Sequence, residues 1–384
     1  MATPTRLFST IGGLRSLRGL AAVLPLLFAL YACAPQEPIR IGFLGALSGR
    51  VTDLGISGLY GARLAVEQRN AADGIRGRAV ELHIEDDRHD PESARKAFRR
   101  LAAKDVVAIV GPMTSVIAQT VLPLANEAQI PLLSPTATST QLSGNDDYFL
   151  RVIPSTAEFS TTTARHFLDR TALRRIRPVI DISNAAYSKS WLRDFSETFE
   201  AGGGSLLDPV TFITDDGTDF DTLARRTLAG EPEAVLIVAG ALDTAMLCEA
   251  VRRRHQTIPL AAAEWAGTER LIELGGSAVE GLLVAQVDQR QSATPNFQDF
   301  REAFLKRYGR EPDFAAIKAY DAAAIVLTTL DAGTPPHDLK NGILKRSSFE
   351  GRQGSIVIDG NGDARAATAT TMVIRRGQWE SSEP

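Results

Sequence analysis

The stretch IRIGFLGALSGRVTDLGISGLYGARLAV, residues 39–66, decides how this chain is built. Its first part, Ile39 to Leu44, is a short apolar run typical of a buried β-strand. A loop rich in glycine and serine follows from Gly45 to Gly55. Beyond the loop, apolar residues recur at helical spacing at Ile56, Leu59, Ala62 and Val66. The stretch therefore predicts a strand, a loop and a helix in series.

The same alternation of strand and helix continues along most of the chain. The predicted strands after the first lie at 80–84, 106–110, 131–134, 178–182, 210–213, 234–239 and 258–262. Helices are predicted between them, and one begins clearly where Asp90 can cap it and Pro91 suits the first position. Strands that alternate with helices favour parallel sheets covered by helices. We expect an α/β protein of two doubly wound units, with a ligand site in the cleft between them.

The tail of the chain departs from this rhythm. Two helices are predicted at 297–308 and 312–330. Two apolar runs, 354–358 and 370–374, then flank the turn sequence Asp359-Gly360-Asn361-Gly362. Such a turn between apolar runs predicts that the two runs pair as a β-hairpin. We expect the tail to cross again between the two units and not to form a third domain.

The N-terminus has the features of a secretory leader. Three arginines, Arg6, Arg15 and Arg18, precede an apolar run that ends at Cys33. The alternative interpretation of this run is a transmembrane helix. The run is, however, shorter than the ~20 residues that such a helix needs. Ala32 followed by Cys33 resembles a bacterial lipobox, and this resemblance implies cleavage after residue 32 and acylation of Cys33. We expect a signal peptide at 1–32, a lipid-anchored linker at 33–38, and a protein held at the periplasmic face of a membrane.

Composition narrows the class of protein. The formal net charge of −4, with both signs interspersed along the chain, argues against a nucleic-acid partner. Of the two cysteines, lipid would occupy Cys33, so Cys248 has no disulfide partner and we interpret it as a buried apolar residue. The five histidines show no metal-ligand spacing, and no dinucleotide, Walker, zinc-protease or serine-hydrolase motif is present. We therefore expect no enzyme activity, cofactor or metal.

Several ordered segments resemble one known family, the type I periplasmic solute-binding proteins of the leucine/isoleucine/valine branch of ABC importers. The segments include IRIGFLGALSG at 39–49, GARLAVEQRNAADGIRGRAVEL at 61–82, VAIVGPMTS at 107–115, IPLLSPTATS at 130–139 and AVLIVAG at 234–240. The resemblance implies the Venus-flytrap fold, in which two doubly wound lobes close on a ligand. It also implies three hinge crossovers, near Ser155, Gln286 and Gly351. The first lobe would comprise 39–154 plus 287–350, and the second 155–286 plus 351–380.

The family also implies a function. The chain would be an extracytoplasmic, monomeric binding lipoprotein that captures an amino acid or a related small polar solute and presents it to an ABC permease in the inner membrane. One alternative is a lipoprotein that uses the same fold to regulate a membrane or cell-wall enzyme. Only residues 34–38 separate Cys33 from the first strand, which leaves no room there for the added helical-repeat domain that such regulators usually carry. An α/β enzyme is a further alternative, disfavoured by the missing motifs.

Candidate binding residues follow from both the local chemistry and the resemblance. The helix predicted from Ser115 begins with free N–H groups that favour a carboxylate, and the Ser115 hydroxyl adds a donor. The family match implies that Ala137 and Thr138 hold the ligand's carboxylate and ammonium groups. It implies that Tyr187 closes over the ligand and that Glu264 accepts from the ammonium. Further residues that could line the pocket are Leu54, Ala241 and Trp265.

Each of these assignments has an ordinary alternative. Ser115 and Thr138 are residue types that commonly cap helices and turns. Tyr187 could simply pack on one face of a helix, and Glu264 could be a solvated loop charge. The segment Tyr187-Ser188-Lys189-Ser190 also departs from the family's YGxG pattern, because it lacks the glycine that lets the backbone approach a ligand. The structure must decide whether these side chains meet.

Overall fold

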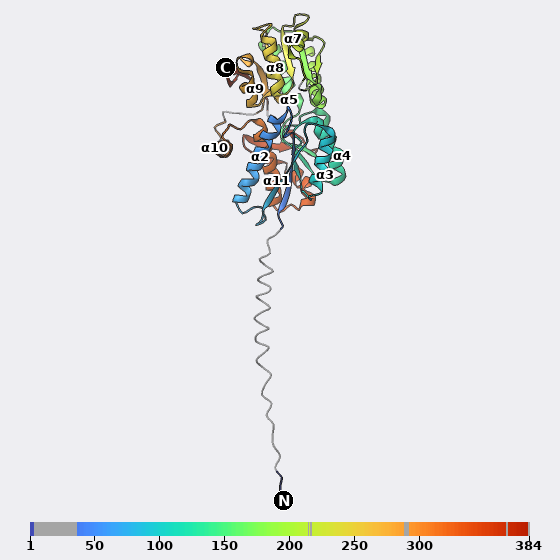
Figure 1. Cartoon of the computed structure of the whole chain (residues 1–384), viewed down its shortest axis with the longest axis vertical. Coiled ribbons are helices and arrows are strands. Elements are labelled where there is room, and N and C mark those ends of the chain that lie inside the picture. The colour runs from blue at the N-terminus through green and yellow to red at the C-terminus, as the bar shows by residue number, and fades with distance from the viewer. Residues whose placement is uncertain (4–36, 214, 216, 288–291, 366–367, 383–384) are drawn as a thin grey trace. The chain divides into compact units, whose positions relative to one another are not determined.

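The computed structural model describes residues 1–3, 37–213, 215, 217–287, 292–365 and 368–382 (Figure 1). Its contacts divide the chain into two units, Met1–Pro38 and Ile39–Pro384. Most of the predicted leader, including the acylation site Cys33, lies outside the described residues. Within the described part of the chain, no helix is long and apolar enough to cross a membrane. Every element discussed below belongs to the second unit.

The first sheet is parallel throughout, as the strand–helix alternation predicts. Its strands occur in the order β2-β1-β3-β4-β5. Their bounds are Ile39–Gly45 for β1, Val80–Asp86 for β2, Ile109–Val110 for β3, Leu132–Ser134 for β4 and Phe149–Arg151 for β5. The analysis of the sequence did not predict β5, because three residues after a polar loop carry too little periodicity to be recognised. These residues form a strand because they pair with β4, and their own sequence pattern does not indicate this pairing.

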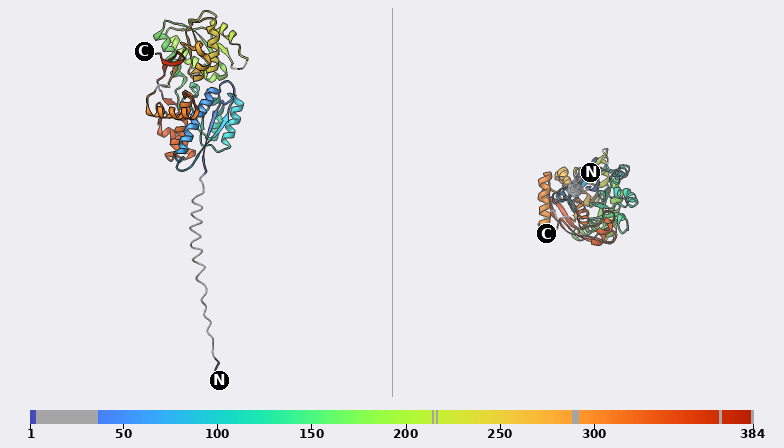
Figure 2. Two further views of the ribbon diagram at one scale, coloured as in Figure 1. Left: turned by 60° about the vertical axis from the view of Figure 1, so that its left-hand side comes forward. Right: turned by 90° about the horizontal axis from the view of Figure 1, so that it is seen from below.

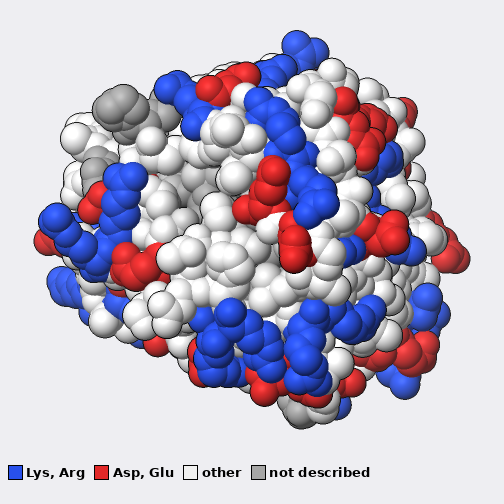
Figure 3. All heavy atoms as spheres, turned by 90° about the horizontal axis from the view of Figure 1, so that it is seen from above, with Lys and Arg blue, Asp and Glu red and all other residues white. Residues whose placement is uncertain are grey.

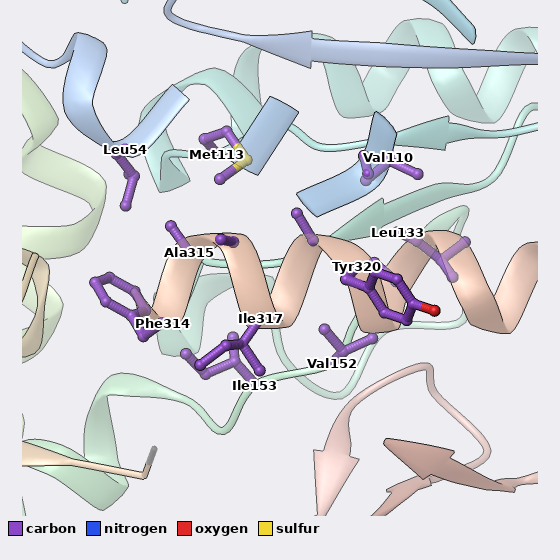
Figure 4. Close-up of a cluster of buried hydrophobic side chains, with 14 of the residues drawn as sticks. Leu54, Val110, Met113, Leu133, Val152, Ile153, Phe314, Ala315, Ile317 and Tyr320 are labelled. Atoms are coloured by element: carbon purple, nitrogen blue, oxygen red, sulfur yellow. The ribbon is translucent and has the colours of Figure 1, made fainter. Parts of the chain in front are cut away.

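Helices pack around this sheet. They are α2 at Thr52–Ala71, α3 at Pro91–Ala102, α4 at Ser115–Ala128, α10 at Pro295–Tyr308, α11 at Phe314–Asp331 and α12 at Leu339–Arg346. The predicted start of α3 is confirmed, since the Asp90 side chain accepts a hydrogen bond of 2.7 Å from the Ser93 N–H. Helix α11 is almost wholly buried, and Figure 4 shows Val110, Leu133 and Ile153 around it. Gly61 lets α2 approach α11, because a Cβ there would lie 2.0 Å from the Ala316 carbonyl oxygen.

The second sheet has a parallel centre and an antiparallel edge. Its order is β16-β15-β11-β10-β9-β6-β7, with β8 also paired to β6. The bounds are Arg175–Asp181 for β6, Ser205–Leu206 for β7, Val210–Phe212 for β8, Ala234–Val238 for β9, Leu260–Ala262 for β10, Leu283–Gln286 for β11, Thr370–Arg375 for β15 and Gln378–Ser381 for β16. The helices of this half are α5 at Thr156–Arg170, α6 at Ala185–Ala201, α7 at Phe220–Leu228, α8 at Ala241–Arg252 and α9 at Glu269–Gly275.

The predicted hairpin between 354–358 and 370–374 is wrong in its second strand. Strand β13, Gly354–Ile358, pairs with β12, Ser348–Gly351, and with β14, Ala364–Arg365, in a small antiparallel sheet. Strand β15 instead pairs with β11 of the second sheet. The turn sequence did reverse the chain, but the strand after it is only two residues long and has a charged residue. A pattern of apolar residues indicates a strand without indicating its partner.

Two lobes result, one around each large sheet (Figures 1 and 2). We propose that the chain passes between them three times. We propose lobe boundaries that differ from the sequence expectation in the last passage. The Arg151 N–H donates to the Gly362 carbonyl oxygen, so the β13–β14 segment lies against β5 of the first lobe. The third passage would then follow Arg365 and not Gly351. On the face shown in Figure 3, side chains of both charge signs are interspersed.

Candidate ligand-binding site

The site lies where segments that follow strands of both sheets meet, which is the usual ligand position in doubly wound folds. Eleven residues line the cavity there: Leu54, Met113, Thr114, Thr136, Thr138, Ile153, Asn184, Tyr187, Glu264, Trp265 and Phe314. The volume of the cavity is about 10 Å³, which is room for little more than one water molecule. The structure is therefore a closed form, and a ligand of amino-acid size enters it only if the lobes or the lining side chains move.

Glu264 is the acidic group of the cavity. It begins a short 3₁₀ turn after β10 and is 5% exposed. Its Oε2 accepts from the Trp191 Nε1–H at 2.8 Å, and its Oε1 accepts from the Thr138 hydroxyl at 3.2 Å. Burial raises the pKa of Glu264 to about 7, although hydrogen bonds from Trp191, Tyr187 and Thr138 act in the opposite direction. The loop-charge alternative is excluded, because this carboxyl is buried.

Aromatic rings lie beside this carboxyl. The Tyr187 and Trp265 rings are 5.6 Å apart in an edge-to-face arrangement, and the Trp265 N–H points to the Tyr187 hydroxyl at 3.4 Å. Burial raises the pKa of Tyr187 well above its ordinary value, so its hydroxyl remains a donor. The segment 187–190, where the family's glycine is missing, lies in the first turns of α6. Helix α6 begins at Ala185, so all four residues of this segment are helical.

The binding loop is the first-lobe segment 135–144, which follows β4. It brings Thr138 to the cavity, whereas two other predicted residues, Ser115 and Ala137, lie behind the cavity wall. The Ala137 N–H donates to the Ser134 hydroxyl at 3.0 Å. The Ser115 hydroxyl accepts from the Ser139 N–H at 3.1 Å. Neither Ser115 nor Ala137 lines the closed cavity. Ser115 thus has the structural role of holding the loop in place, in addition to any contact it makes with a ligand.

Asn184, which the sequence analysis missed, contacts the helix start that was expected to receive a carboxylate. Its side-chain oxygen accepts from the Val116 N–H, in the first turn of α4, at 3.0 Å. Asn184 follows β6 in the second lobe, so this bond joins the two lobes. Its position just after a predicted strand was the one available signal, and nothing local distinguished it from other loop residues.

The apolar wall of the cavity was predicted in part. Leu54 and Trp265 line it as expected, whereas Ala241 does not line it and is buried in α8. Figure 4 shows Leu54, Met113 and Phe314 gathered where α11 begins. Phe314 comes from a helix more than two hundred residues after Leu54, so only the tertiary structure brings them together.

Polar contacts also connect the lobes beside the cavity. The Arg50 guanidinium lies 2.5 Å from the Asp243 carboxylate, which is 3% exposed. The Asp53 carboxylate accepts from the Thr268 hydroxyl at 2.9 Å, and burial raises the pKa of Asp53. The Thr140 N–H donates to the Ser190 hydroxyl at 3.1 Å. These contacts join the two lobes in the closed form.

Two further side chains, Cys248 and Asp86, have structural surroundings. Cys248 is buried, and burial raises the pKa of its thiol to about 12, so it is not poised as a nucleophile. Asp86 accepts from the Leu47 N–H at 2.8 Å and from the Ser48 hydroxyl at 2.6 Å, which fixes the loop after β1. Among the described residues, no three His, Cys, Asp or Glu side chains are placed to hold a metal ion.

Comparison with known proteins agrees with this geometry. A family model described as periplasmic binding protein matches residues 38–373. The chain belongs to this family. The Leu/Ile/Val-binding protein of Escherichia coli strain K12 is 25% identical over 350 residues, which cover 90% of this chain and 93% of that protein. The leucine-specific-binding protein of Salmonella typhimurium is 24% identical over 342 residues, covering 86% of this chain and 89% of that protein.

Solved structures of periplasmic binding proteins share the fold. The leucine binding protein LivK of Thermotoga maritima has a TM-score of 0.82 at 25% identity, covering 90% of this chain and 97% of its own. A solute-binding protein of R. palustris in complex with benzoate also has a TM-score of 0.82, at 18% identity, covering 90% of this chain and 95% of its own. The two-lobed α/β fold class is thus confirmed. Family membership implies an extracytoplasmic binding protein and not an enzyme.

Proposed function

We propose that this protein is the substrate-binding lipoprotein of an ABC importer and that its ligand carries an ammonium group, as an amino acid does. The observation that carries the proposal is Glu264, a buried carboxyl that lines the cavity. None of the eleven lining residues is Lys, Arg or His. A ligand ammonium would therefore supply the positive charge that this carboxylate lacks, as a charge-assisted pair in a site without water.

The rest of the cavity supports an amino acid with an apolar side chain. Leu54, Met113, Ile153 and Phe314 form an apolar wall, which would receive such a side chain. The carboxylate of the ligand would bind at the start of α4, where the Val116 N–H now donates to Asn184. The curated relatives named above bind leucine, isoleucine or valine according to their names, which fits this division of the cavity.

Closure of the lobes would be the signal for transport. Because the closed cavity has almost no free volume, the ligand must bind to an opened form and then be enclosed. The enclosed form would be recognised by a permease in the inner membrane. We also propose that acylated Cys33 tethers the protein near that membrane, since two or more acyl chains hold a protein stably where one does not.

Calorimetry and thermal unfolding with matched ligands test this proposal. We would compare L-leucine with two analogues, one lacking the amino group and one lacking the carboxylate, and then screen the other amino acids. At a ligand concentration near 100 times Kd, a true ligand stabilises the protein by about 2.7 kcal/mol. We expect at least one amino acid to bind and its analogue without the amino group to fail. Equal binding of that analogue would contradict the role of Glu264. If no solute stabilises the protein, the regulator hypothesis is favoured.

A further inference from the structure

The loop that carries Thr138 is held by a buried arginine that does not line the cavity. Arg151, on β5, is 2% exposed. Its Nη1 donates to the Ser139 carbonyl oxygen at 3.1 Å, directly after Thr138 in the chain. Its Nη2 donates to the Ser143 hydroxyl, further along the same loop. One guanidinium thus holds two points of the binding loop.

Asp363, from the distant β13–β14 turn, holds this arginine. Its Oδ1 lies 2.7 Å from Arg151 Nη2, and its Oδ2 accepts from the Gly144 N–H at 2.8 Å. The turn sits directly on β5, because a Cβ at Gly362 would lie 2.6 Å from the Phe149 carbonyl oxygen. A segment near the C-terminus is therefore joined to the binding loop directly at Gly144 and, through Arg151, at Ser139 and Ser143.

Stability alone does not explain this arrangement. Removing a guanidinium from water is energetically unfavourable, and burial lowers the pKa of Arg151. Well-packed apolar residues are often as stabilising as a buried ion pair, but they do not fix backbone carbonyls in direction. The planar guanidinium satisfies the Ser139 carbonyl, the Ser143 hydroxyl and Asp363 at once, which a lysine ammonium does not do in the same geometry.

Other contacts also hold the loop, near Thr138 and Ser139. The Ser115 hydroxyl accepts from the Ser139 N–H, and the Thr156 N–H donates to the Thr138 carbonyl oxygen at 2.7 Å. Both of these bonds act at residues 138 and 139. Arg151 and Asp363 extend the support to Ser143 and Gly144, so that the loop is held along its length.

We propose that Arg151, oriented by Asp363, is a positioning residue for ligand binding, because it fixes the loop that presents Thr138 to the cavity. The proposal rests on the function proposed above. It also assigns a role in binding to the β13–β14 turn, which contributes no residue to the lining of the cavity.

The test uses Arg151→Lys and Asp363→Asn in the full chain. Matched controls are Arg301→Lys and Glu311→Gln, which alter an exposed ion pair of the same types. Two quantities are measured: Kd for the best ligand of the screen, and hydrogen–deuterium exchange of the loop 135–144 without ligand. We expect Arg151→Lys to raise Kd at least tenfold and Asp363→Asn threefold or more, with faster exchange confined to the loop. The controls should change neither quantity.

Each outcome has a defined meaning. Unchanged loop exchange in the folded variants would overturn the proposal, and so would unchanged affinity despite faster exchange. If Arg151→Lys does not fold, Asp363→Asn decides alone, because it keeps the size and the hydrogen-bonding capacity of the side chain. If the unaltered protein binds no solute, the proposed function fails, while loop exchange still shows whether Arg151 positions the loop.

Discussion

The two walls of the cavity are built in different ways. The first-lobe wall is a loop whose backbone is fixed from several sides, by Ser115, Arg151 and the Thr156 N–H. The second-lobe wall depends on one carboxyl group, Glu264, held by the side chains of Trp191 and Tyr187. From the opposite lobe, among the residues that the structure describes, the Thr138 hydroxyl donates to Glu264.

This difference indicates an order of events. The bonds that Ser115 and Arg151 make to this loop lie within the first lobe and remain when the lobes separate, so the loop is ready to receive a ligand in the open form. Glu264 loses the Thr138 hydroxyl and gains water on opening, so its interaction with an ammonium becomes strong only on closure. We infer that the first lobe captures the ligand and that the second lobe discriminates the charge.

The largest effect is expected from removing the discriminating charge. Glu264→Ala should weaken amino-acid binding by about 2–5 kcal/mol, because the buried ammonium would lose its only acidic partner in the lining. Isothermal titration calorimetry measures the loss, and Glu273→Ala on the exposed face of α9 is the control. Unchanged affinity would show that the second-lobe wall does not select ligands by their ammonium charge.

Next in size is a dependence of stability on pH. The pKa of Glu264 is raised from its ordinary 4.5 to about 7 in the closed form, so the folded protein retains a proton that the unfolded chain releases. This contribution to the free energy of unfolding is full below about 4.5 and is lost as pH rises through about 7. It amounts to roughly 3 kcal/mol, because one pKa unit corresponds to about 1.4 kcal/mol.

Urea unfolding between pH 4.5 and 8 measures this contribution. Burial also raises the pKa of Asp87 to about 7, so the raw curve of the unaltered protein combines several groups. The difference in the free energy of unfolding between that protein and Glu264→Gln isolates Glu264. It should change steadily as the pH rises from 4.5 to 8, and the unaltered protein should lose stability relative to Glu264→Gln. A difference that does not vary with pH would mean that the carboxyl is hydrated without ligand, that is, that the free lobes stand open.

The smallest effect is expected from a contact at the rim. Asp243→Asn removes the charge that Arg50 meets across the lobes, so the closed form should lose about 1 kcal/mol and Kd should rise about fivefold. Kd is measured at low and at high salt, and the effect should be smaller at high salt. Asp331→Asn, in an exposed pair within the first lobe, is the matched control. An equal effect from the control would show that the Arg50–Asp243 contact does not specifically stabilise the closed form.

The sequence predicted the parts of the fold that depend on local pattern. The strand at Ile39–Gly45 and the capped start of α3 follow from apolar runs and end signals that act within a few residues. Strand β5 and the partner of β13 were missed, because pairing between distant segments leaves no local pattern. In the same way, Thr138, Tyr187 and Glu264 were named from family positions, whereas Asn184 and Phe314 carried no signal.

By itself the sequence determined an α/β chain, its alternating order and the residue types available for a charged ligand, since periodicity, turns and helix caps act over short distances. Only the tertiary structure decided that Glu264 is enclosed, that Ser115 supports a loop behind the cavity, and that Asp363 reaches Arg151. The reason is physical: burial raises the pKa of a carboxyl, and contact joins residues two hundred positions apart, only after the chain has packed.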